Sequence, residues 1–177
     1  MRIFPVLGGA SYSSDYNAVA RPGMRKHDGV DIFAPEGTPL LAVDDGVASF
    51  GTDPLGGNVI NLRAPDGTRY YYAHLSRFEG GSRSVRAGEL LGYVGTTGNA
   101  VGKPPHLHFE AHPAFGGASP GGPIDPFPLL RNASVVQRRS ITTAAPSPLP
   151  GILLAAGLVA GSYLVARQAS KRRWRWA

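Results

Sequence analysis

Short apolar stretches alternate with polar turn sequences between residues 21 and 130. The stretches are rich in valine, isoleucine, leucine and tyrosine. Glycine, proline, aspartate or asparagine separates them, which is typical of strands joined by turns. We predict strands at 40–43, 47–50, 58–63, 68–73, 90–94 and 106–111. No long helix is evident here, so the pattern predicts a mainly β fold of antiparallel sheets packed into a compact domain.

Local composition divides the rest of the chain. The sequence APDGT at 64–68 lies between two predicted strands and indicates a β-hairpin turn. We predict an N-terminal extension at 1–21, the β domain at 22–130 and a linker at 131–148. The linker is polar and ends in a stretch of proline, serine and alanine, which is typical of a connecting segment.

A C-terminal apolar segment follows the linker. Residues 149–166 carry no charge, and as a helix they would be about 27 Å long, close to the hydrocarbon thickness of a bilayer. The alternatives are a buried core helix or a loose amphipathic tail. Residues 167–177 form a basic tail with Trp174 and Trp176, which favours a single transmembrane helix that contacts a lipid membrane together with its tail. The spacing of Gly157 and Gly161 would allow such helices to self-associate.

Charge and cysteine content exclude several classes of protein. The net charge is +6, but the first 130 residues hold ten basic and twelve acidic side chains, and all eight remaining basic residues come later. The β domain is therefore near neutral, and we expect no nucleic acid partner. The chain has no cysteine, which excludes a disulfide framework and a thiolate zinc site. Any metal must be held by histidine and carboxylate.

Histidines recur in a pattern that suits a metal. Side chains alternate along a strand, so His106, His108 and Glu110 should point to one face. His27 and Asp31 are four residues apart, in a glycine- and proline-containing stretch that argues against a helix. Zinc accepts three such ligands and leaves a fourth position for water. His27, Asp31 and one histidine of the 106/108 pair complete that set, and the other histidine would lie beside the water.

His74 is a fourth candidate, since a histidine at a strand end can converge on the same place. The alternative to a metal site is that His106 and His108 are a pair of half-exposed histidines at a sheet edge. Alternation would also place Tyr70 and Tyr72 on the face of His74, where they would border a substrate groove. The alternative for both tyrosines is ordinary strand packing. Glu110 either orients a histidine or lies at the surface. We interpret His112 as structural or exposed.

These motifs together resemble the lysostaphin-type, LytM-like zinc peptidoglycan endopeptidases. The resemblance covers about residues 22–130 and rests on five motifs in order: His27-x-Gly29-x-Asp31, Gly37-Thr38-Pro39, Tyr72-Ala73-His74-Leu75, Gly92-x-x-Gly95-x-Thr97-Gly98, and His106-Leu107-His108-Phe109-Glu110, followed by Ile124-Asp125-Pro126. It implies the duplicated-hybrid-motif-like antiparallel fold of that family. It also implies one Zn²⁺ ion held by His27, Asp31 and His108, with His74 and His106 as catalytic histidines. The loop before His106 is longer than usual in the family.

The resemblance implies hydrolysis of a peptide bond in peptidoglycan, at a glycine-rich bridge or a stem cross-link. The alternatives are a catalytically silent module that binds peptidoglycan or activates an amidase, and a structural minor membrane protein of a virion. The basic tail predicts a single-pass topology with the peptidase domain on the opposite side. No cleavable signal sequence is evident at 1–20. We expect the protein to be located in the cell envelope or in the membrane of a bacterial virus. A lysis enzyme of phage origin is a further alternative.

Overall fold

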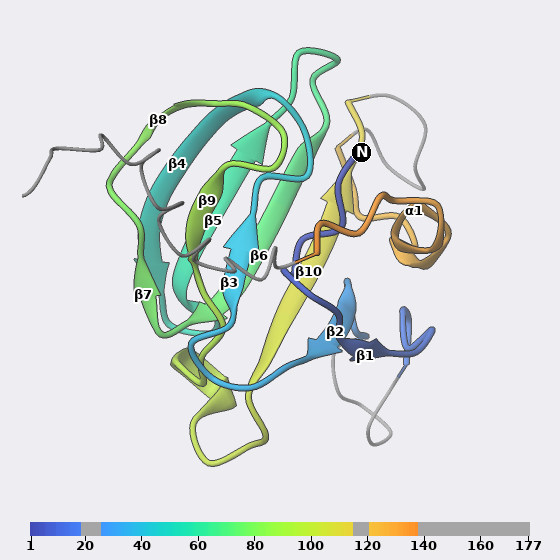
Figure 1. Cartoon of the computed structure of the whole chain (residues 1–177). Helices are drawn as coiled ribbons and strands as arrows, with labels where there is room; N and C mark the ends of the chain where they lie inside the picture. The colour runs from blue at the N-terminus through green and yellow to red at the C-terminus, as the bar shows by residue number, and fades with distance from the viewer. Residues whose placement is uncertain (19–25, 115–120, 138–177) are drawn as a thin grey trace, which may run out of the picture. The chain divides into compact units, whose positions relative to one another are not determined.

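Two antiparallel sheets make up the structure, a computed structural model that describes residues 1–18, 26–114 and 121–137. The larger sheet has the strand order β1-β2-β10-β6-β5-β4-β8, and the smaller has the order β3-β9-β7 (Figure 1). The elements are β1 Ser11–Tyr12, β2 Val30–Phe33, β3 Pro39–Leu41, β4 Gly46–Asp53, β5 Gly57–Arg63, β6 Arg69–Leu75, β7 Arg77–Phe78, β8 Arg83–Val85, β9 Leu90–Tyr93, the 3-10 turn η1 Gly98–Ala100, β10 His106–His112 and α1 Phe127–Arg131. The predicted mainly β, antiparallel fold is confirmed.

The six predicted strands correspond to β3, β4, β5, β6, β9 and β10. The predicted hairpin is also present, because β5 pairs with β6 and the amide of Ala64 donates to the carbonyl oxygen of Thr68 at 2.8 Å. The short strands β1, β2, β7 and β8 were not predicted. All four are two to four residues long, too short for alternation to be detected in the sequence.

The core lies between the two sheets. Ile60, Tyr72 and Phe109 from the large sheet and Leu40 and Leu91 from the small one are fully buried. Burial of each large apolar side chain typically stabilises a fold by about 1.5–3 kcal/mol. The Tyr72 hydroxyl donates to the carbonyl oxygen of Leu41 at 3.1 Å and accepts from the amide of Val43 at 3.0 Å. This tyrosine therefore fixes the segment after β3 against the large sheet.

The N-terminal residues belong to this core. Phe4 and Val6 are buried, Val6 bridges to Leu40, and Ile3 bridges in parallel to Ser134. The amide of Phe4 also donates to the carbonyl oxygen of Ser134 at 2.9 Å. The predicted extension at 1–21 and the predicted start of the linker at 131 therefore need correction. Residues near both predicted boundaries pack into the domain, because their apolar side chains are buried in the core and their backbones form hydrogen bonds with each other.

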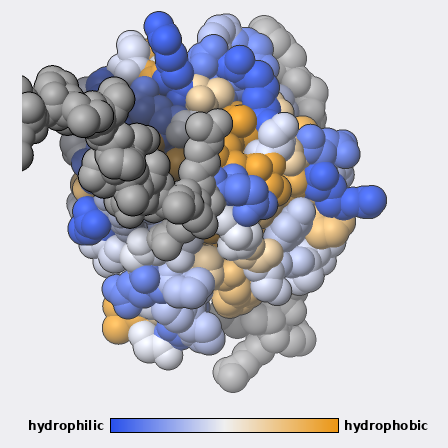
Figure 2. Space-filling view, in the orientation of Figure 1, coloured by the Kyte–Doolittle hydropathy of each residue, from blue (hydrophilic) through white to orange (hydrophobic). Residues whose placement is uncertain are grey.

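The predicted membrane segment at 149–166, its Gly157 and Gly161 pair and the tail at 167–177 lie outside the described residues. Within the described part of the chain, no helix has the length and apolarity needed to span a membrane. On the face seen in Figure 2, hydrophilic residues cover much of the described surface, with smaller apolar areas between them. Most of the large apolar side chains of the described residues are buried in the core.

Candidate metal centre

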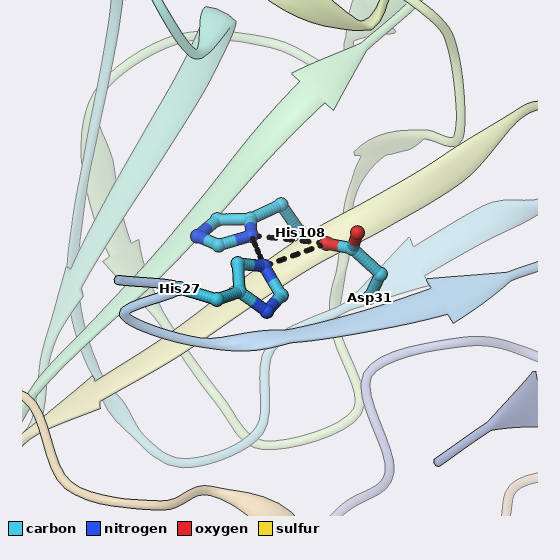
Figure 3. A group of neighbouring side chains, drawn as sticks. All are labelled: His27, Asp31 and His108. Atoms are coloured by element: carbon cyan, nitrogen blue, oxygen red, sulfur yellow. Dashed lines mark hydrogen bonds and ion pairs between the residues drawn. The ribbon is translucent and has the colours of Figure 1, made fainter. Parts of the chain in front are cut away.

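Three side chains, two on adjacent strands and one just before β2, meet at one point of the large sheet. His108 on β10 pairs directly with Asp31 on β2, and His27 lies just before β2. The Nε2 atom of His27 lies 2.9 Å from Nδ1 of His108 and 3.1 Å from Oδ1 of Asp31. Nδ1 of His108 lies 3.0 Å from the same Asp31 oxygen. Figure 3 shows the two imidazoles and the carboxylate directed at one another.

This triangle suits a small divalent cation. Zinc bonds to imidazole nitrogen and carboxylate oxygen are about 2.0–2.2 Å long, so neighbouring ligands of a tetrahedral ion lie about 3.3 Å apart. The observed separations of 2.9–3.1 Å are only slightly shorter. The three residues are the one His/Cys/Asp/Glu group in the described chain with metal-ligand spacing. The donor set therefore fits zinc with a fourth position left open.

Hydrogen bonds at the outer nitrogens select the ring tautomers. His27 Nδ1 faces the carbonyl oxygen of Asp15 at 3.2 Å, and a carbonyl oxygen only accepts, so this nitrogen carries the proton. His108 Nε2 donates to Oε1 of Glu110 at 2.9 Å. In both residues the inner nitrogen is then the one that would bind a metal, once it carries no proton. Partners of this kind fix ligand orientation in metal sites.

Carboxylates dominate the electrostatics of the cluster. Burial opposes the charged form of His108, but its bonds to Asp31 and Glu110 outweigh burial and raise its pKa to about 9. Burial likewise acts against ionisation of Glu110, yet bonds to His108 and His112 lower its pKa to about 2. The same competition, with His108 and His27 as partners, holds the pKa of Asp31 well below its usual range. The pocket thus holds two anionic carboxylates around the imidazoles.

His74 and His106 lie beside this cluster. Their ring centroids are 5.0 Å apart, and the His74 ring lies 6.0 Å from that of His108. Nδ1 of His106 donates to the carbonyl oxygen of Pro104 at 2.8 Å, and Nδ1 of His74 donates to that of Thr97 at 2.9 Å. In both rings Nε2 therefore remains available. Nε2 of His106 lies 3.9 Å from Oδ2 of Asp31.

The conformation of His74 explains how it reaches the site. Its φ angle is 67°, in the left-handed region that non-glycine residues rarely occupy. The pairing of β5 with β6 shifts register between Asn58 and Ile60, so β6 carries an extra residue there. Burial and the nearby His106 and His108 lower the pKa of His74 to about 4. His74 is therefore neutral at neutral pH.

The predicted placement of Tyr70 and Tyr72 at the groove is wrong. They are only 2% and 0% exposed and pack against Phe109 in the core. Tyr71 instead occupies the site face, edge-on to the His108 ring with centroids 6.4 Å apart. Its hydroxyl donates to Oδ2 of Asp53 at 2.5 Å. The bulge in β6 places Tyr71 and His74, three residues apart, on the same side, where alternation requires an even spacing.

Glu110 and His112 form a buried pair behind His108. Oε2 of Glu110 lies 2.5 Å from Nε2 of His112, whose Nδ1 is 3.0 Å from the carbonyl oxygen of Gly121. Glu110 thus occupies the orienting place that was one of its two predicted alternatives. His112 is buried, and only its spacing of two from Glu110 and four from His108 could have indicated that it shares their face.

The antiparallel β fold and the histidine–aspartate site together are those of a metallopeptidase. Residues 25–126 match the family model described as Peptidase family M23. The chain belongs to this family, which confirms the resemblance seen in the sequence.

Two curated relatives and one solved structure illustrate the likeness. The chain is 47% identical over 88 residues to the DD-carboxypeptidase/endopeptidase Mpg of Neisseria meningitidis, covering 49% of this chain and 20% of that protein. It is 35% identical over 137 residues to the L-Ala--D-Glu endopeptidase of Bacillus subtilis, covering 72% and 41%. The catalytic domain of the antimicrobial peptidase lysostaphin from Staphylococcus simulans superposes with a TM-score of 0.57 at 33% identity, covering 70% and 92%. The chain thus spans from a fifth to two fifths of these curated relatives' length.

Proposed function

We propose that the chain is a zinc-dependent endopeptidase that hydrolyses peptide cross-links of bacterial peptidoglycan. The observation that carries the proposal is the convergence of His27, Asp31 and His108 within 3.1 Å of one another, beside two further histidines. Membership of Peptidase family M23 and the peptidase names of the relatives support it. A silent binding module would not need all five of these side chains together.

His27, Asp31 and His108 would hold the zinc ion through Nε2, an Oδ atom and Nδ1. The chemistry that zinc supplies with such donors is Lewis-acid activation of water and of the scissile carbonyl. Asp15 and Glu110 keep the two imidazoles in the tautomer that presents the inner nitrogen. The protein's contribution at this point is preorganisation, because the ligands are already oriented before the substrate arrives.

His74 and His106 would move the proton. Each has Nδ1 fixed by a backbone carbonyl and Nε2 directed away from it, so each can accept a proton from the attacking water at Nε2. That proton is then delivered to the leaving amine. The second histidine, once protonated, can donate to the oxyanion that develops on the carbonyl oxygen. Both rings are anchored at Nδ1 in the same way, so either histidine has the geometry to serve as the base and the other as the donor.

Membrane attachment is a separate part of the proposal. The uncharged segment at 149–166 and the basic, tryptophan-containing tail support a single transmembrane anchor with the peptidase domain on the side opposite the tail. Such an enzyme would act from the cell envelope or from the membrane of a bacterial virus, where it could serve in entry or lysis. Alkaline extraction of the expressed protein from membranes, with residues 149–177 present or deleted, tests the anchor.

Mass spectrometry of fragments released from purified cell walls tests the enzymatic proposal. We expect the full-length protein to release peptides with a new amino terminus, which also identifies the bond. Walls of several cross-link types should be used, since the names of the two curated relatives describe different bonds. Binding to walls with no new amino terminus on any of them would favour the silent module, or a structural protein of a virion.

A further inference from the structure

Two arginines lie on the same face of the large sheet as the metal centre. Val47, Arg63 and Arg69 are directly paired neighbours on β4, β5 and β6. Ser49 and Asn61 occupy the next row on the same face. These five residues line a shallow hollow of about 230 Å³. The hollow is therefore framed by two guanidinium groups, a hydroxyl and an amide.

The two arginines have no acidic partner in the described part of the chain. Arg63 and Arg69 face each other across β5 and β6, and like charges directly opposite in a sheet are destabilising. By contrast, Arg2, Arg77 and Arg83 each pair with an aspartate or glutamate. Two facing arginines without an acidic partner lower the stability of the fold. An anionic ligand that binds between them would balance their charge and would explain why both are present.

Arg69 is already held in place. Its Nη1 donates to Oδ1 of Asn61 at 2.9 Å, and its guanidinium lies 5.9 Å from the centroid of the Tyr71 ring. Two acids that contact Tyr71 and His108 on this face have other partners. Asp53 accepts from the hydroxyl of Tyr71, and Glu110 bonds to two histidines. The guanidinium is thus preorganised and only partly buried, so its remaining donors are available to a ligand.

The distance between the hollow and the metal centre is about the length of a short extended peptide. His108 is paired with Ala73, and Arg69 is four residues further along β6. At about 3.3 Å per residue the separation is about 13 Å, which corresponds to roughly four residues of an extended substrate. Tyr71 lies between the two places and contacts both the His108 ring and the Arg69 guanidinium.

We propose that Arg63 and Arg69, with Asn61, form a carboxylate subsite that selects acidic peptides over neutral glycine-rich ones. The inference rests on the proposed endopeptidase function and specifies its substrate class. Arginine binds carboxylates through two parallel N–H···O bonds, and such charge-assisted bonds are the stronger kind. A stem peptide with a free carboxylate some four residues from the scissile bond would engage the hollow and the metal centre together.

The test uses two cross-linked muropeptides that differ at a single group, a free carboxylate or its carboxamide. The kcat/KM of the zinc-loaded full-length protein is measured for both at 150 mM salt. We expect a preference for the carboxylate of about 10–100-fold, in line with one or two charge-assisted bonds. The double variant Arg63→Gln/Arg69→Gln should lose this preference, so that the ratio of the two kcat/KM values falls to about one. The control Arg77→Gln/Arg86→Gln removes the same charge from elsewhere and should retain the preference.

A binding measurement separates the subsite from catalysis. Fluorescence anisotropy of both labelled peptides on zinc-stripped protein should show tighter binding of the carboxylate form, and the Arg63→Gln/Arg69→Gln variant should abolish the difference. An arginine-dependent binding preference without hydrolysis would refute the endopeptidase and leave the subsite standing. Hydrolysis of both peptides with equal kcat/KM, or a preference lost equally in both double variants, would overturn the subsite and leave the endopeptidase standing.

Discussion

The rings of His74 and His106 lie edge to face with centroids 5.0 Å apart, although they come from different strands. His106 reaches this position by ordinary alternation along β10. His74 reaches it because β6 carries a bulge and the residue adopts a left-handed backbone conformation with φ of 67°. Such conformations cost free energy and cluster at functional sites. The pair is therefore a structural reason to expect proton transfer beside the metal centre.

Substitution of the two β10 histidines should separate metal binding from catalysis. His108→Ala removes a ligand nitrogen, so we expect zinc and activity to be lost together. His106→Ala should retain zinc and lower kcat by about 100–10,000-fold, the usual contribution of a general acid or base. Zinc content by mass spectrometry and clearing of cell walls are measured on both variants. Equal zinc loss in the two would show that the ligand assignment within the pair is wrong.

Local geometry predicts part of this site from the sequence, whereas the full ligand set of His27, Asp31 and His108 came from the resemblance to a known family. A spacing of two places His106 and His108 on one face of β10 wherever that strand lies, and the structure bears this out. The same alternation argument gives the wrong face for Tyr70 and Tyr72, because β6 contains a bulge whose position depends on how β5 pairs with β6. That is a tertiary property, and no turn residue within β6 marks it in the sequence.

The N-terminal boundary was missed for a related reason. Phe4 and Val6 sit in a short stretch broken by Pro5 and glycines, so periodicity predicts nothing there. The structure buries both because Phe4 pairs with Ser134, more than 120 residues away in sequence, and Val6 pairs with Leu40 of β3. Contacts of this range leave no local pattern. Asp15, which faces His27, lies in the same segment and was missed with it.

Zinc binding should release protons at neutral pH. The Asp31 and Glu110 carboxylates, which outweigh burial, raise the pKa of His108 to about 9 in the metal-free site. The imidazole is then protonated at pH 7 and must lose its proton to become a ligand. We expect release of at least one proton at pH 7, and zinc affinity that rises about tenfold per pH unit until about pH 9.

Calorimetric zinc titrations in buffers of different ionisation enthalpy measure this release. Glu110→Gln removes one of the two carboxylates that raise the pKa, so the variant should release fewer protons at the same pH. Zinc binding to the unsubstituted protein at pH 7 without any proton release would show that His108 is already neutral, and would contradict the electrostatic account of the cluster.

Gly29 should be required for the metal centre because there is no room for a side chain. A Cβ atom there would contact the carbonyl oxygen of Phe109 without space for it, and would lie 3.0 Å from side-chain atoms of His108 and Glu110. Gly29→Ala should therefore push β2 from β10 and lower both the melting temperature and the zinc affinity. Gly81→Ala is the matched control, since a Cβ there meets nothing within 4 Å. Equal behaviour of the two variants would contradict the predicted crowding.

The tyrosines of β6 should differ in what they stabilise. Tyr72→Phe leaves the amide of Val43 without its buried acceptor, so we expect the free energy of unfolding to fall by about 1–3 kcal/mol. Tyr71→Phe removes a bond at a half-exposed position and should cost less. Urea denaturation of both variants measures the difference. A larger loss for Tyr71→Phe would mean that the burial assigned to Tyr72 is incorrect.

Clearing of purified bacterial cell walls by the full-length protein, before and after zinc removal, tests the central proposal most directly. We predict that chelation followed by dialysis stops the clearing, and that one equivalent of zinc restores it in the unsubstituted protein while His108→Ala stays inactive. Clearing that persists after exhaustive removal of zinc would contradict the assignment of His27, Asp31 and His108 as the metal centre of a hydrolase.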